Sequence, residues 1–142
     1  MKILVVDDEE MSIKLIEMQL LKDNHQILTS TDGREAVDII KNEQPDLVIS
    51  DIMMPFMSGL ELLEIIKAEN KKIPVILISA LDDVEVVQTA IGMGADDFII
   101  KPVKMDELAL RIQRVMANAI KRARMGGLLP FVNYEITGKS SF

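Results

Sequence analysis

Short apolar runs alternate with longer segments of helical periodicity along the first 118 residues of the chain. The runs are rich in β-branched and aliphatic side chains and have the length of strands; they cover residues 3–6, 26–29, 47–50, 75–78 and 98–100. The segments between them place apolar residues three or four positions apart: 11–21, 34–41, 60–68 and 84–91, then a longest segment with Leu108, Ile112, Val115 and Ala119 on one stripe. This alternation predicts an α/β fold, a five-stranded parallel sheet with helices on both faces.

Length and composition fit one domain with a short appendage. The 142 residues carry a formal charge of −7, no cysteine and 49% apolar residues. The apolar content is enough for a core, and the missing cysteine excludes a disulfide framework, a thiolate zinc site and a cysteine nucleophile. The apolar runs are too short for a membrane span, and the first strand meets acidic residues at once, so we expect no leader, no membrane partner and a cytoplasmic location.

Charge divides the chain into a body, residues 1–118, and an extension, residues 119–142. The body holds 12 basic and 22 acidic side chains, whereas the extension holds 4 basic and 1 acidic. The body should repel nucleic acid, so we expect nucleic-acid contact only through an output domain outside this chain. The extension is expected to prolong the last helix through residues 121–124, to stop it at Gly126-Gly127, and to continue as an apolar tail or linker.

Polar side chains follow four of the five predicted strands. Asp7 and Asp8 come after the first run, Asp51 after the third, Ser79 after the fourth and Lys101 after the fifth. Because the carboxyl ends of parallel strands meet at one edge of a sheet, we expect these side chains to share a crevice. The sequence therefore predicts a candidate site there.

The residue types in this crevice suit phosphoryl transfer. Three carboxylates without imidazole or thiolate form a hard-oxygen ligand set, which favours Mg²⁺ over zinc. Lys101 and Ser79 would neutralise and hydrogen-bond phosphoryl oxygens, and Asp51, alone at the end of a central strand, is the natural nucleophile. Taken singly, Asp8 or Ser79 could cap a helix, Asp51 could open a turn, and Lys101 could be a solvated lysine.

Other reactive or polarisable residues are given plainer interpretations. His25, the single histidine, lies in a polar turn before the second strand and far from the candidate edge, so it is not expected to carry phosphate. The methionines Met53, Met54 and Met57 are interpreted as packing and loop residues.

The ordered set of motifs resembles the receiver domain of two-component response regulators over residues 1–118. The matching pieces are ILVVDD at residues 3–8, PDLVISDIMMP at 45–55, Gly59, PVILISA at 74–80 and GADDFIIKP at 94–102. The resemblance implies the CheY-like, flavodoxin-like fold with strand order 2-1-3-4-5.

The resemblance also implies roles for the crevice residues. Asp51 would accept a phosphoryl group from a phosphohistidine on a sensor histidine kinase or a phosphotransfer protein. Asp7, Asp8 and Asp51, with the backbone carbonyl of Met53, would hold Mg²⁺.

A switch and an output face follow from the same resemblance. Ser79 would move toward the acyl phosphate and Phe98 would rotate inward behind it, while Lys101, before a cis-proline, would point into the site. The fourth helix, fifth strand and fifth helix would form the face that binds an effector.

Some positions depart from the family pattern. Phe98 replaces a frequent tyrosine. Met53 and Leu81 stand where polar side chains can orient an attacking water, so we expect a long-lived acyl phosphate. One branch of the family forms a dimer that is linked by salt bridges, and this chain has residues that fit it: Asp96, Asp97, Glu107 and Arg111. A homodimer of this kind is therefore a candidate. The branch also has a basic residue in the fourth helix, where this chain has Gln88 and Thr89.

Two functional alternatives remain open from sequence. One is a Mg²⁺-dependent phosphatase or phosphotransferase that uses Asp51 as a transient nucleophile; such an enzyme would place an acid two residues after the nucleophile, where this chain has Met53. The other is a degenerate receiver that only docks partners. The preferred interpretation is a signalling module that catalyses only its own phosphorylation and dephosphorylation.

Overall fold

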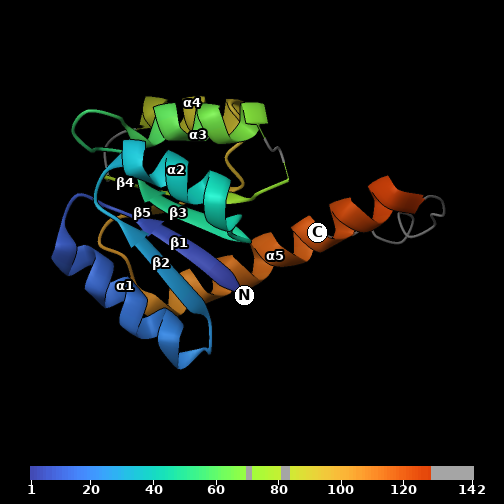
Figure 1. The fold of residues 1–142 in the computed structure, drawn as a ribbon, viewed down its shortest axis with the longest axis horizontal. Helices are drawn as coiled ribbons and strands as arrows, with labels where there is room; N and C mark the ends of the chain where they lie inside the picture. Colours follow the sequence, from blue (N-terminus) through green and yellow to red (C-terminus); the bar gives the residue numbers. More distant parts are fainter. Residues whose placement is uncertain (70–71, 81–83, 129–142) are drawn as a thin grey trace.

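A computed structural model describes residues 1–69, 72–80 and 84–128 as five strands alternating with five helices (Figure 1). The strands are β1 (Lys2–Val6), β2 (Gln26–Ser30), β3 (Leu47–Asp51), β4 (Val75–Ser79) and β5 (Asp97–Ile100). The helices are α1 (Glu10–Lys22), α2 (Gly33–Glu43), α3 (Gly59–Glu69), α4 (Val84–Gly92) and α5 (Met105–Leu128). Each predicted strand is confirmed and extends by only one residue at one end.

The strands form one parallel sheet in the order β2-β1-β3-β4-β5, as the resemblance implies. In the central pairs, Ile3 lies beside Leu47 and Val48 lies beside Val75. Strand β3 is therefore flanked on both sides, and all five of its residues are buried. Its last residue, Asp51, is thereby held at the middle of the carboxyl edge.

Apolar side chains that alternate along the strands build one core on each face of the sheet. One core joins strand residues such as Ile3, Ile49 and Ile76 to α1 and α5. The other joins Leu4 and Leu77 among others to α2, α3 and α4. The ribbon shows the same two layers of helices around the sheet (Figure 1). The prediction of a two-faced α/β sheet is confirmed.

The helix ends differ from the predictions in two places. The N-cap of α1 is Glu9, without a side-chain cap bond, so the alternative in which Asp8 only caps this helix does not hold. Helix α5 passes through Gly126-Gly127 to Leu128, so the expectation that these glycines stop it is also wrong. Glycine lowers helix stability by only about 1 kcal/mol and stops a helix only where it turns left-handed. Residues 129–142, the predicted apolar tail, lie outside the described residues.

The stripe of apolar residues that α1 buries is also narrower than the periodicity of residues 11–21 predicts. Ile13, Ile16 and Leu20 are buried, whereas Leu21 is 52% exposed because it falls on the solvent side of the last turn. No helix in the described part of the chain has the length and apolar character needed to cross a membrane.

Candidate functional site

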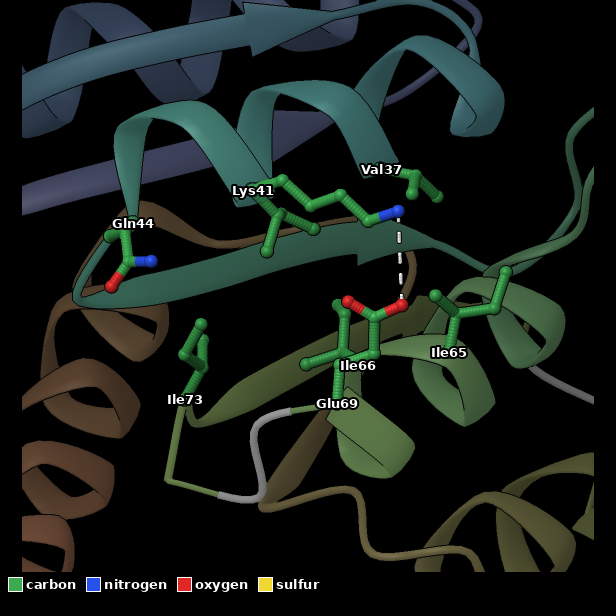
Figure 2. A pocket seen from close by; sticks show the side chains of 8 residues that line it. Val37, Lys41, Gln44, Ile65, Ile66, Glu69 and Ile73 are labelled. Atoms are coloured by element: carbon green, nitrogen blue, oxygen red, sulfur yellow. Dashed lines mark ion pairs between the residues drawn. The ribbon is translucent and has the colours of Figure 1, made fainter.

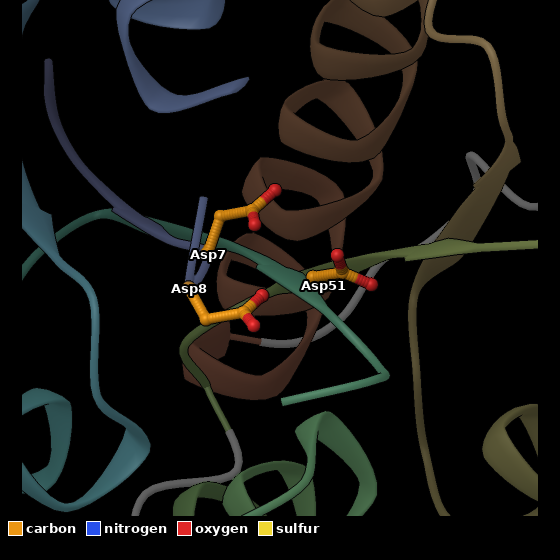
Figure 3. A group of neighbouring side chains, drawn as sticks. All are labelled: Asp7, Asp8 and Asp51. Carbon is orange, nitrogen blue, oxygen red and sulfur yellow. The ribbon is translucent and has the colours of Figure 1, made fainter. Parts of the chain in front are cut away.

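Three carboxylates converge at the carboxyl edge of the sheet, at the ends of β1 and β3. Asp7 and Asp8 follow β1, Asp51 ends β3, and one oxygen from each lies within 4.8 Å of the others (Figure 3). Asp7 and Asp51 are buried, whereas Asp8 faces solvent. The β1–β3 pairing, in which Val6 lies beside Ser50, brings these strand ends side by side.

Burial disfavours the ionised form of the Asp7 side chain. The pKa of Asp7 is raised from 3.8 to about 6, chiefly by desolvation and further by the charges of Asp51 and Asp8. Two groups oppose this shift: the Glu9 backbone N–H, which donates a 2.9 Å hydrogen bond to Asp7 Oδ1, and the Lys101 ammonium. The cluster is therefore a place where a cation would be stabilised.

Lys101 reaches the cluster from the end of β5. Its ammonium donates a 2.8 Å hydrogen bond to Asp51 Oδ2, and the side chain is 38% exposed. The pKa of Lys101 is raised, first by this hydrogen bond and then by the charges of Asp51, Asp7 and Glu9. The Lys101-Pro102 peptide bond is cis. Lys101 is thus part of the site rather than a free surface lysine.

Ser79 and Phe98 lie beside this edge on neighbouring strands. Asp51 of β3 pairs with Ile78 of β4, and Ser79 is the next residue of β4. Ser79 is buried, and its hydroxyl donates a hydrogen bond to the Ala80 carbonyl at 3.3 Å. Phe98 packs half-buried against the core that contains α3 and α4. Their switch roles stay predictions.

The loop after Asp51 bonds back to it. The Met53 N–H donates to Asp51 Oδ1 at 3.2 Å, so Asp51 also orders the turn that follows it. The interpretation of the methionines as packing and loop residues holds: the Met53 side chain is 66% exposed in the loop, whereas Met54 and Met57 pack against the second core. The role of the Met53 carbonyl as a metal ligand stays a prediction.

The remaining sequence candidate lies elsewhere. His25 Nδ1 is 3.3 Å from the N-terminal amine of Met1, just before β2 and at the opposite edge of the sheet. The expectation that His25 stays apart from the acidic cluster is confirmed.

Two hollows differ in their relation to the cluster. One, of about 460 Å³, opens between α1 and the β5–α5 loop, and its walls include Asp7, Glu9 and Lys101. The other, of about 220 Å³, lies between α2 and α3 (Figure 2). Its rim carries an exposed Lys41–Glu69 ion pair at 3.8 Å above aliphatic side chains, and none of the three clustered aspartates lines it. Of these two hollows, the first reaches Asp7 and Lys101.

The donor set fits a magnesium ion. Mg²⁺ prefers a few carboxylate oxygens and retains several waters. Asp7 and Asp51 supply buried oxygens, and exposed Asp8 leaves the solvent side open for water. The charges of Asp51 and Asp8 add to the desolvation that raises the pKa of Asp7, and a cation bound among the three carboxylates would oppose both effects.

Several residues near the site were not singled out from sequence. Glu9 fixes Asp7 through its backbone N–H, and the run of four acids at 7–10 was the available signal. Gly59 was noted from sequence as a matching position of the family pattern, but its close packing was not: a Cβ there would lie 2.3 Å from the Asp51 carbonyl oxygen. Arg34 lies over Phe56 in the loop after Asp51, a long-range contact with no sequence signal.

Comparison with known proteins agrees with this geometry. The family model of the response regulator receiver domain matches residues 3–113. The transcriptional regulatory protein TcrX of Mycobacterium tuberculosis is 36% identical over 114 residues, which cover 80% of this chain and 49% of TcrX. The crystal structure of the NtrX receiver domain from Brucella abortus is 38% identical with a TM-score of 0.78, covering 81% of this chain and 98% of that one.

The chain belongs to the response regulator receiver domain family, a class of phosphorylation-switched signalling module. A further relative is the alkaline phosphatase synthesis regulatory protein PhoP of Bacillus subtilis, 31% identical over 81% of this chain and 48% of PhoP. The chain spans about half the length of these curated relatives.

Proposed function

We propose that Asp51 accepts a phosphoryl group from a phosphohistidine on a sensor histidine kinase or a phosphotransfer protein, with Mg²⁺ in the acidic cluster. The observation that carries this proposal is the buried Asp51 carboxylate, bonded to the Lys101 ammonium at 2.8 Å and grouped with Asp7 and Asp8. A buried carboxylate without a partner would be destabilising. Here the positive charge of Lys101 lies beside Asp51, where it would also stabilise the added negative charge of a phosphoryl group.

The chemistry assigns a task to each side chain. Asp7, Asp8, Asp51 and the Met53 carbonyl would hold the ion, which supplies charge neutralisation for the transferring phosphoryl group. One carboxylate oxygen of Asp51 attacks phosphorus, the P–N bond breaks, and its electron pair returns to the imidazole. Lys101, already 2.8 Å from Asp51 Oδ2, shifts onto a phosphoryl oxygen, and the Ser79 hydroxyl donates to another. The module works on itself and is not a turnover enzyme.

The signal would leave through α4, β5 and α5. Phe98 in β5 packs against the core below α4, and Val84 and Ile91 of α4 are exposed apolar side chains that an effector could cover. Rotation of Phe98 behind Ser79 would reshape this face, as the resemblance implies. An acyl phosphate adds charge at one edge, and this pair would convert the charge into a packing change.

A homodimer through the same face would have to exchange ion pairs. Arg111 bonds Asp97 at 2.8 Å and Glu107 at 3.3 Å within its own chain, and Lys67 bonds Asp96 at 3.0 Å. These acids and Arg111 are the residues that fit the family's salt-bridged dimer. A dimer of that kind would need Arg111 to leave Asp97 or to share it with the partner chain.

The domain division is proposed as a receiver at residues 1–118 followed by an extension at 119–142. Helix α5 runs on to Leu128 and projects beyond the sheet, as the ribbon shows (Figure 1). Because the curated relatives are about twice as long as the matched segment, we take the extension as the start of a connection to an output domain. Any nucleic-acid binding would belong to that domain, and the cytoplasm is the proposed location.

Intact-mass measurement with acetyl phosphate tests the proposal. The wild type should gain one phosphoryl group in the presence of Mg²⁺ and none after chelation, and Asp51→Asn should gain none. The exposed Asp38 of α2 gives a matched control, Asp38→Asn, which should behave as the wild type. Phosphorylation that persists in Asp51→Asn, or continuous phosphate release with many turnovers, would overturn it.

A further inference from the structure

An exposed contact joins the start of α2 to the loop that follows Asp51. The Arg34 guanidinium carbon lies 4.4 Å from the centre of the Phe56 ring. The guanidinium is itself fixed, because its Nη2 donates to Asp32 Oδ2 at 2.8 Å while Asp32 Oδ1 accepts the Arg34 backbone N–H at 2.8 Å as the cap of α2. Because the Arg34 side chain is already held by Asp32, its contact with the ring costs little additional conformational entropy.

Phe56 occupies a backbone conformation that a bulky side chain rarely adopts. Its φ is +69°, and the Met57 N–H bonds the Pro55 carbonyl at 2.7 Å across it, which makes Phe56 the centre of a γ-turn. The Phe56 side chain is 79% exposed, so core burial does not stabilise this turn. A strained residue of this kind persists where its surroundings hold it, and it points to a functional constraint.

The turn belongs to the loop that shapes the acidic cluster. The loop leaves Asp51 through the Met53 N–H bond to Asp51 Oδ1 and closes where the Gly59 N–H bonds the Ile52 carbonyl at 2.9 Å. On its outer side, a Cβ at Gly33 would lie 3.0 Å from Met57 Cβ, so the first turn of α2 rests directly on the loop. A movement of this loop relative to α2 would shift the Met53 backbone relative to Asp51.

We propose that Arg34 and Phe56 form a latch, the cation–π contact between them, that positions the β3–α3 loop and thereby sets the affinity of the acidic cluster for Mg²⁺. This inference rests on the proposed function for the presence of a metal in the cluster. Arg34 and Phe56 are positioning residues: they act through the loop backbone. The latch keeps the Met53 carbonyl and the Asp51 carboxylate in register before a metal or a phosphodonor arrives.

Variants of the two latch residues test this in the intact chain. Phe56→Leu and Phe56→Gly remove the ring, the second also allowing the positive φ without strain, and Arg34→Gln removes the cation. Each should weaken Mg²⁺ binding, measured by calorimetric titration, by roughly two- to fivefold, the fold-change expected for an exposed cation–π contact. The double variant Arg34→Gln/Phe56→Leu should lose no more than one of them alone, because both break the same contact.

Hydrogen exchange gives a readout that does not depend on phosphorylation. The Met53 and Met57 amides should exchange faster in the variants without Mg²⁺, while the melting temperature stays close to that of the wild type. Phe56→Tyr, which keeps the aromatic face, should restore wild-type affinity and exchange. Arg114→Gln, at an exposed arginine on α5, is the matched control and should change neither.

The outcomes separate the latch from the proposed function. If the wild type binds Mg²⁺ and is phosphorylated but Arg34→Gln and Phe56→Leu bind the metal equally well, the latch is wrong. Wild-type affinity in Phe56→Gly, or a lowered melting temperature with unchanged Mg²⁺ affinity, would also overturn it, because strain or a purely structural role would then explain the contact. A wild type that binds no Mg²⁺ and accepts no phosphoryl group would instead overturn the proposed function.

Discussion

Lys101 and Asp51 are fifty positions apart in sequence, yet the lysine ammonium donates a 2.8 Å hydrogen bond to Asp51 Oδ2. The bond joins the end of β5 to the end of β3 across the intervening strand β4. It places a fixed positive charge on the carboxylate proposed to receive the phosphoryl group. A divalent cation and this ammonium would both be attracted to the same carboxylate.

Removal of the Lys101 charge should therefore separate metal binding from phosphoryl transfer. In Lys101→Met we expect Mg²⁺ to bind a few-fold to about tenfold more tightly, because a neighbouring positive charge is lost. Phosphorylation by acetyl phosphate at saturating Mg²⁺ should slow by at least about tenfold, because a phosphoryl oxygen loses its partner. Calorimetry and intact-mass time courses measure the two effects. Lys104→Met, at an exposed lysine three residues further on, is the control, and weaker metal binding in Lys101→Met would contradict the expectation.

The raised pKa of Asp7 predicts a pH dependence of stability without Mg²⁺. The folded chain keeps the Asp7 proton up to about pH 6, whereas a free aspartate loses it near 3.8, so folding takes up a proton between these values. The contribution of neutral Asp7 to the free energy of unfolding is therefore present at low pH and is lost as pH rises through about 6. Asp7→Asn removes this loss and should be more stable than the wild type at pH 7.5, by the order of 1–3 kcal/mol, with little difference near pH 4.

Urea unfolding of both proteins across this pH range measures the difference. The same titration predicts that Mg²⁺ affinity of the wild type falls, up to tenfold per pH unit, as pH drops below about 6, because protons then compete for Asp7. Saturating Mg²⁺ at pH 7.5 should stabilise the wild type and not Asp7→Asn. A stability difference that is independent of pH would show that Asp7 ionisation is not its cause.

The close packing around Gly59 predicts that a larger residue at this position lowers the stability of the fold. In Gly59→Ala the new methyl would lie 2.3 Å from the Asp51 carbonyl oxygen and 2.8 Å from Ile52 Cα, both backbone atoms that cannot rotate away. We expect a loss of about 2–4 kcal/mol in the free energy of unfolding. Gly92→Ala is the matched control, since nothing lies within 4 Å of its Cβ position at the end of α4, and it should be neutral or slightly stabilising. Equal effects in the two variants would rule out the packing explanation.

Met53 predicts a slow loss of the phosphoryl group. Its exposed thioether stands two residues after Asp51 and is a poor hydrogen-bonding partner for an attacking water. We expect the wild-type acyl phosphate to last minutes or longer after the donor is removed, and Met53→Asn to shorten its lifetime several-fold. Phosphate release followed by intact mass measures both. A wild-type half-life of seconds would contradict the expectation, and Met53→Leu serves as the apolar control.

The strand pattern shows why the fold was predictable. The run 75–78 is apolar at every position and 47–50 at all but Ser50, a pattern typical of strands that are covered on both faces, and both strands were found within one residue. The ends of these strands then located Asp51 and Ser79 at one edge by topology alone. Helix ends were less predictable, because Gly126-Gly127 weakens a helix without forbidding it and Leu21 differs from Leu20 only by one step around the helix.

Sequence alone determined the alternating elements, the parallel sheet and the grouping of Asp7, Asp8, Asp51, Ser79 and Lys101 at its carboxyl edge, because period and order along the chain fix these. Only the tertiary structure decided which oxygen Lys101 bonds, that burial raises the pKa of Asp7, and that Arg34 rests on Phe56. These depend on distances and solvent exclusion between segments far apart in sequence, and no local pattern encodes such distances.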